Sequence, residues 1–114
     1  MSRHIPVLTI YVEDVDVAAG YYCDVLGFAV KARYGADIAT LENTGSMIVL
    51  ETVRAGERPR VVPGIQVEDV EGAFKDLRNK GANLIDAAPR DFPAGRCFSM
   101  RDCAGNELDI LQFT

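Results

Sequence analysis

The tetrapeptide Val-Glu-Asp-Val occurs twice in this chain, at residues 12–15 and 67–70, an offset of 55 residues. An alternating apolar segment precedes each copy, and a segment with helical spacing follows it and ends at Gly27 or Gly81. A repeat of this length is typical of a duplicated supersecondary unit, in which each copy needs the other to complete a core. The chain is therefore predicted to fold as two copies of one unit.

Each copy is predicted to begin with a strand that passes directly into a helix. Asp14 and Asp69 stand at the junctions and are the expected N-caps, because a short acceptor side chain can bind the free N–H groups of a first helical turn. Apolar residues then recur at helical spacing, and the residues expected on the buried helix faces are Ala18, Tyr21, Tyr22 and Val25 in the first copy and Val70, Ala73, Phe74 and Leu77 in the second. Three further strands are expected in each copy, at 29–34, 38–42 and 47–53, and at 83–86, 96–100 and 107–113.

The predicted fold class is α+β, with two tandem βαβββ modules at about residues 4–54 and 60–114 of a single 114-residue domain. One face of each strand is uniformly apolar, as at Leu8 and Ile10, and is expected to lie under a helix. The other face is mixed. We expect a curved mixed sheet around a cleft, with the helices outside and a small-molecule site on the mixed faces.

Composition excludes several function classes. The net charge is −5 and no Lys/Arg-rich stripe is present, which argues against nucleic acid as a partner. No apolar run reaches the roughly 18 residues that a membrane helix requires, and no secretory signal is recognisable, so a cytoplasmic protein without membrane association is expected. The three cysteines include no Cys-x-x-Cys pair and are expected to be free thiols without a nucleophilic role.

The segments Tyr-Tyr-Cys-Asp-Val-Leu-Gly-Phe (21–28) and Asp-Cys-Ala-Gly-Asn-Glu-Leu-Asp-Ile (102–110), together with the internal repeat, carry a family resemblance. The chain resembles, over nearly its whole length, the vicinal oxygen chelate superfamily of glyoxalase I, bleomycin-resistance proteins, fosfomycin-resistance enzymes and extradiol dioxygenases. The resemblance implies paired βαβββ modules and, for chains of this length, a homodimer. It does not indicate one activity.

Superfamily enzymes commonly hold a divalent metal through His on the first strand of a module and Glu on its last strand. By this resemblance the four ligand positions are Val7, Val49, Val62 and Asp109. Valine has no lone pair to offer, so the usual metal centre is predicted to be missing. His4 is expected to be a solvent-exposed residue near the N-terminus, because its parity turns it away from the face of Val7.

The mixed faces supply the candidate ligand-binding residues. Tyr11 and Gln66 occupy matching positions in the two copies, and Arg96 and Phe92 belong to a Pro-Ala-Gly segment that is expected to form a mobile lid. The full set of predicted ligand-binding residues is Thr9, Tyr11, Met47, Glu51, Gln66, Phe92, Arg96, Glu107, Asp109 and Leu111. No cofactor is expected. The alternative is a hard divalent cation held by Glu51, Glu107 and Asp109, since oxygen ligands suit such ions.

Three interpretations of function remain at this stage. The leading one is a metal-free small-molecule-binding protein, similar to bleomycin-resistance proteins, that sequesters a drug or metabolite, with a cationic or polyhydroxylated ligand suiting an acidic cleft. The second is a divergent lyase, isomerase or dioxygenase that recruits a metal through carboxylates or uses Glu51 or Asp109 as general base. The third is a domain whose mixed face serves mainly to form a homodimer.

Overall fold

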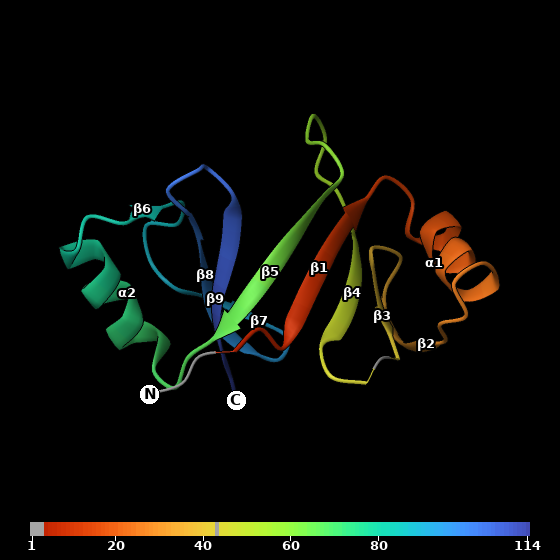
Figure 1. Ribbon diagram of the computed structural model, residues 1–114, viewed down its shortest axis with the longest axis horizontal. Coiled ribbons are helices and arrows are strands. Elements are labelled where there is room, and N and C mark those ends of the chain that lie inside the picture. The colour runs from red at the N-terminus through yellow and green to blue at the C-terminus, as the bar shows by residue number, and fades with distance from the viewer. Residues whose placement is uncertain (1–3, 43) are drawn as a thin grey trace. The chain divides into compact units, whose positions relative to one another are not determined.

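The computed structural model describes residues 4–42 and 44–114, which form two compact units (Figure 1). The first unit comprises Pro6–Val62. The second comprises Pro63–Thr114 together with His4 and Ile5. The strand that follows the first unit's βαβββ sequence, β5 (Arg60–Gln66), contributes its first three residues to the first unit and the rest to the second.

The first unit is built on a four-stranded mixed sheet in the order β2-β3-β4-β1. Its strands are β1 (Val7–Val12), β2 (Val30–Tyr34), β3 (Ile38–Leu41) and β4 (Met47–Thr52), with helix α1 (Val15–Asp24) after β1. Strands β1 and β4 run parallel, whereas β3 pairs antiparallel with both β4 and β2. The predicted β-α-β-β-β order is confirmed here to within two residues at each strand end.

The second unit repeats this plan with the order β5-β9-β8-β6. Helix α2 (Val70–Asn79) follows β5, and the remaining strands are β6 (Asn83–Leu84), β7 (Arg90–Phe92), β8 (Gly95–Arg101) and β9 (Glu107–Phe113). Strands β5 and β9 are parallel, while β8 pairs antiparallel with β9, β6 and β7. The predicted α+β class, with two βαβββ modules and a helix on one face of each module's sheet, is confirmed.

Strand β7 was not predicted, and it corrects the expectation of a mobile lid at residues 90–95. Arg90 pairs with Cys97 and Phe92 with Gly95, so the first half of the expected loop is one arm of an antiparallel hairpin. Gly95 permits the hairpin to lie close to β9, because a Cβ on Gly95 would come within 1.9 Å of the Gln112 carbonyl oxygen. Arg90 and Phe92 are therefore held by a backbone ladder.

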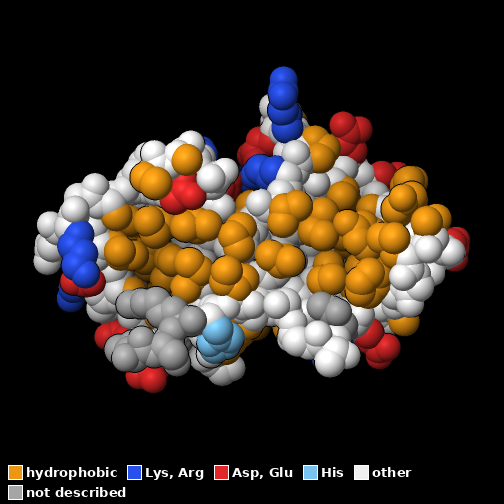
Figure 2. Space-filling view, in the orientation of Figure 1, with side chains coloured by type: hydrophobic (Ala, Val, Ile, Leu, Met, Phe, Trp, Pro, Cys, Tyr) orange, Lys and Arg blue, Asp and Glu red, His pale blue; other side chains and the backbone are white. Residues whose placement is uncertain are grey.

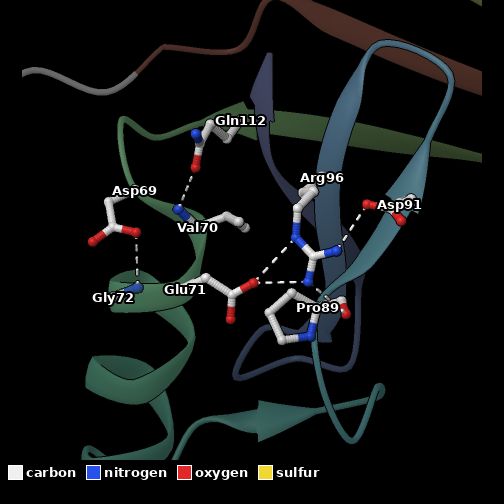
Figure 3. Close-up of polar contacts among 8 residues, drawn as sticks. All are labelled: Asp69, Val70, Glu71, Gly72, Pro89, Asp91, Arg96 and Gln112. Carbon is white, nitrogen blue, oxygen red and sulfur yellow. Dashed lines mark hydrogen bonds and ion pairs between the residues drawn. The ribbon is translucent and has the colours of Figure 1, made fainter. Parts of the chain in front are cut away.

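Both predicted N-caps are confirmed. Asp14 Oδ1 accepts the Val17 N–H at 3.1 Å, and Asp69 Oδ1 accepts the Gly72 N–H at the same distance. A second acceptor serves α2, since Gln112 Oε1 on β9 accepts the Val70 N–H at 2.9 Å (Figure 3). The tetrapeptide Val-Glu-Asp-Val is thus the point at which each strand ends and each helix begins.

The two helices differ in how well the predicted buried face matches the structure. On α2 the prediction is correct, because Val70 and Phe74 are buried and Phe74 meets the Phe98 ring edge-on at 5.1 Å. On α1 it is partly wrong: Val15 and Ala19 form the buried contacts, whereas Tyr21 and Val25 are exposed. Helix α1 is apolar on more than one side, so spacing alone could not decide which side packs on the sheet. Neither helix among the described residues has the length and apolar character needed to cross a membrane.

Candidate functional site

Strand register defines the face of each sheet that its helix does not cover, which we call the helix-free face. In the second unit Asp109 pairs with Gly64 on one side and with Ser99 on the other, and Leu111 pairs with Gln66 and Cys97. The helix packs instead on the alternate residues, among them Phe98 and Ile110. The helix-free face of the second unit carries Gln66, Arg90, Phe92, Cys97, Ser99, Glu107, Asp109 and Leu111.

Asp109 is the centre of a polar network on this face. Ser99 Oγ donates to Asp109 Oδ1 at 2.6 Å and accepts from Arg90 Nη2 at 3.1 Å. Arg90 Nη1 also pairs with Asp86, whose Oδ2 accepts the Ser99 backbone N–H at 2.6 Å. The network therefore fixes one oxygen of Asp109. Within the described residues no donor reaches the other oxygen, Oδ2, which leaves it available to a ligand.

The surroundings of Asp109 favour the neutral form of its carboxyl group more than solvent favours that of an exposed aspartate. Burial raises the pKa of Asp109 above its ordinary value, the Ser99 hydrogen bond and the Arg90 charge oppose that rise, and Glu107 and Asp86 add to it. Burial also raises the pKa of the Cys97 thiol. The thiol is therefore neutral at pH 7, and a nucleophilic role for Cys97 finds no support.

The first unit presents a different helix-free face. Val7, Thr9 and Tyr11 of β1 pair in register with Met47, Val49 and Glu51 of β4, and all six point away from α1. The guanidinium of Arg60 lies over the Tyr11 ring, 4.1 Å from its centroid, and is also paired with Glu57 at 2.8 Å. A cation thus already covers one side of the Tyr11 ring, one of the predicted ligand-binding side chains.

Nine of the ten predicted ligand-binding residues lie on a helix-free face, and Arg96 is the exception. Its neighbour in register is Gln112, and its side chain reaches α2, where Nε and Nη2 donate to Glu71 Oε1 at 3.1 and 2.7 Å (Figure 3). Nη1 binds Asp91 at 2.8 Å. These carboxylates raise the pKa of Arg96. Arg96 ties the hairpin to the helix and does not share a face with Asp109.

The residues at the superfamily's metal positions do not fit a transition metal. Register places Val7 and Val49 on the helix-free face of the first unit and Asp109 on that of the second, and Val62 is buried on β5. Three of these four side chains have no donor atom, and Asp109 Oδ1 is already bound by Ser99. Across residues 4–42 and 44–114 no three His, Cys, Asp or Glu side chains converge as a metal-binding group. His4, the pale blue side chain in Figure 2, is exposed as predicted.

Sequence reasoning missed four residues of these faces: Asp86, Arg90, Ser99 and Arg60. The sheet faces on which Ser99 and Arg90 lie follow from the strand registers. Asp86 follows β6 and contacts Ser99 across 13 residues. Period-two parity puts Ser99 on the same side of β8 as Cys97, but only the β8–β9 register places it opposite Asp109.

The comparisons agree with this arrangement. Residues 4–110 match the family model described as Glyoxalase/Bleomycin resistance protein/Dioxygenase superfamily. An uncharacterized protein of Mycolicibacterium smegmatis (strain ATCC 700084 / mc(2)155) is 32% identical over 110 residues, which are 95% of this chain and 93% of that protein.

Two solved structures illustrate the shared fold. A glyoxalase/bleomycin resistance protein/dioxygenase superfamily member from Vibrio splendidus 12B01 is 21% identical, with a TM-score of 0.77 over 99% of this chain and 100% of that one. Methylmalonyl-CoA epimerase from Mycobacterium tuberculosis is also 21% identical, with a TM-score of 0.75 over 96% of this chain and 87% of that one. Because the family model matches residues 4–110 of the 114 residues, this chain belongs to the glyoxalase/bleomycin resistance protein/dioxygenase superfamily.

Proposed function

We propose that this protein binds a small molecule on its helix-free faces and sequesters it without a bound transition metal. The observation that carries the proposal is the identity of the side chains at the superfamily's metal positions. Val7, Val49 and Val62 cannot coordinate an ion, and Asp109 is held by Ser99. A face that keeps the superfamily's sheet but replaces its metal ligands with apolar side chains suits ligand burial better than Lewis-acid chemistry.

The polar groups of the second unit's helix-free face favour a cationic or polyhydroxylated ligand. Asp109 Oδ2 offers an unused acceptor, and Glu107 and Asp86 add negative charge nearby, beside the positive charges of Arg90 and of Arg101, which pairs in register with Glu107. Leu111 and Phe92 supply apolar surface beside these groups. Sugars bearing amino groups, including glycopeptide and aminoglycoside antibiotics, combine the hydroxyl and ammonium donors that such a face accepts.

A thermal-shift panel tests this proposal. Candidate amino sugars, aromatics and thiol conjugates are added to the wild type, and at least one amino-bearing compound is expected to raise Tm in a concentration-dependent way. Asp109→Asn is expected to weaken that ligand about tenfold or more, because it replaces a charged acceptor with a neutral one. Arg96→Lys is the matched control on the opposite face and should bind as the wild type does. A ligand that binds Asp109→Asn and the wild type equally would contradict the proposed site.

A second candidate is an enzyme that uses Asp109 as general base. The raised pKa of Asp109 favours it, since a carboxylate with a raised pKa is a better proton acceptor, and methylmalonyl-CoA epimerase is among the structures of similar fold. In this case Asp109 Oδ2 would take the proton from a carbon next to a thioester carbonyl and later return it. Incubation with methylmalonyl-CoA in D2O tests it: deuterium entering the substrate with the wild type and not with Asp109→Asn would favour the enzyme.

The homodimer, the cytoplasmic location and the sequestration of a drug are further parts of this proposal. The superfamily resemblance supports the first, and the absence of a spanning helix within the described residues is compatible with the second. Size-exclusion chromatography with light scattering tests the homodimer, and cell fractionation tests the location. Expression in a drug-sensitive host tests sequestration, where the expected result is a raised inhibitory concentration for the same compounds that raise Tm.

A further inference from the structure

Helix α1 carries an apolar stripe on the side turned away from its sheet. Val17, Tyr21 and Val25 follow one another at intervals of four residues, and Leu26 is the next residue along the chain, just beyond the helix end. Their exposed fractions are 69%, 55%, 63% and 52%. We call these four residues the α1 stripe.

The duplicated module provides an internal control for this stripe. At the offset of 55 residues, Tyr21 and Val25 correspond to Asp76 and Lys80 of α2. Those two residues are exposed and form an (i, i+4) ion pair with 3.0 Å between Lys80 Nζ and Asp76 Oδ2. Val17 corresponds to Gly72. The same helix in the same fold therefore has a polar outer side in one copy and an apolar outer side in the other, so the fold itself does not require the α1 stripe.

We infer that the α1 stripe is the interface through which two copies of this chain associate, α1 against α1. A twofold homodimer places the same surface on both sides of its interface, so a stripe confined to one helix is suited to packing against itself. The inference refines the homodimer of the proposed function and does not depend on which ligand binds.

The geometry of the helix suits this packing. Val17, Tyr21 and Val25 form one i±4 ridge, and the most frequent class of helix packing interdigitates such ridges from both partners. Gly20 lies next to this ridge, and a Cβ built on it would meet nothing within 4 Å, so the backbone of a partner can approach there.

Charge and area are compatible with a second copy as the occupant. Asp16 is neutralised by Arg33, 2.7 Å away. In an antiparallel pair the other exposed acid, Asp24, lies toward the N-terminus of the partner helix, where the dipole favours negative charge. The exposed fractions correspond to about 400 Å² of apolar surface per chain. Since interfaces are about 57% apolar, the whole contact would cover roughly 700 Å² per partner, close to the size of a standard interface.

The test replaces two residues of the α1 stripe with the residue types found at the corresponding positions of α2. Sedimentation velocity over a concentration series is expected to give a dimer for the wild type and a monomer for Tyr21→Asp/Val25→Lys, with the dissociation constant raised about 100-fold or more. The matched control is Asp76→Lys/Lys80→Asp, which also leaves the net charge unchanged and should remain a dimer. Val17→Lys changes the most exposed position of the α1 stripe and should also be a monomer. It replaces the double variant in the test if the double variant does not fold.

The outcomes separate the interface from the rest of the proposed function. A wild type that stays monomeric throughout the series would overturn both the homodimer and this interface. A dimer that persists in Tyr21→Asp/Val25→Lys and in Val17→Lys would overturn the interface alone. Ligand binding is scored separately by the thermal-shift panel, so its failure leaves this inference standing.

Discussion

At the scale of single residues, Asp109 makes stability depend on pH. Because its folded-state pKa lies above that of an unfolded aspartate, the folded state holds this proton more tightly. The contribution of Asp109 is therefore fully present below the unfolded pKa and is lost as the pH rises through the folded pKa. Asp109→Asn cannot ionise, so its stability relative to the wild type is expected to increase as the pH rises from the unfolded pKa of aspartate, about 3.9, through the raised folded-state pKa.

Urea unfolding of both proteins at several pH values in this range measures that difference. Ser99→Ala serves as a second variant, because it removes the hydrogen bond that opposes the rise in the Asp109 pKa and should move the transition to higher pH. A wild-type minus variant difference that stays constant with pH would contradict the role assigned to burial of Asp109.

The residue scale is also where the sequence was least informative. Asp109 could be selected from the motif around Gly105, yet nothing in the local sequence indicated that Ser99 would bind it or that Arg90 would bind Ser99. These contacts follow from the β8–β9 and β7–β8 registers, which depend on hairpin geometry. Arg96 was assigned to the ligand for its chemistry, whereas its parity on β8 turns it to α2.

At the scale of elements, the two N-caps make a quantitative prediction. Asp14→Ala and Asp69→Ala are each expected to lower the free energy of unfolding by about 1 kcal/mol, because each leaves the N–H of a first helical turn without its acceptor. The Asp→Asn variants keep an acceptor oxygen and should lose only a fraction of this. Chemical denaturation of the four variants provides the measurement, and equal losses for Ala and Asn would indicate that charge at the helix N-terminus matters more than the hydrogen bond.

The helices and most strands were predictable, because caps, terminal glycines and period-two alternation are local signals. Gly27 and Gly81 have φ values of +81° and +80°, the left-handed conformation that the sequence suggested for them. The burial of α1 was not predictable, since apolar residues occupy several of its sides. Strand β7 was missed because Pro93 and Gly95 are typical of a loop, and here Pro93 lies in the tight turn of a hairpin whose second strand begins at Gly95.

At the scale of the whole molecule, the prediction concerns metal content. Protein purified without chelators is expected to contain iron, nickel or zinc at well below one atom per chain, because only one of four ligand positions carries a donor side chain. Neither added Zn²⁺ nor added Mn²⁺ should raise Tm, since a metal that binds the folded state would stabilise it. Elemental analysis and thermal unfolding check these expectations, and a stoichiometric transition metal would contradict the metal-free interpretation.

The boundary between the two units has a practical consequence for anyone who wishes to separate them. His4 and Ile5 lie with the second unit, where the His4 carbonyl accepts the Gln66 N–H at 3.1 Å, although the sequence places them ahead of the first. If the chain is divided between the two modules, the C-terminal fragment thus loses the His4 carbonyl as a hydrogen-bond acceptor for Gln66, because His4 stays with the N-terminal fragment. In a complementation assay, the two fragments should therefore associate more strongly when the N-terminal fragment keeps His4 and Ile5.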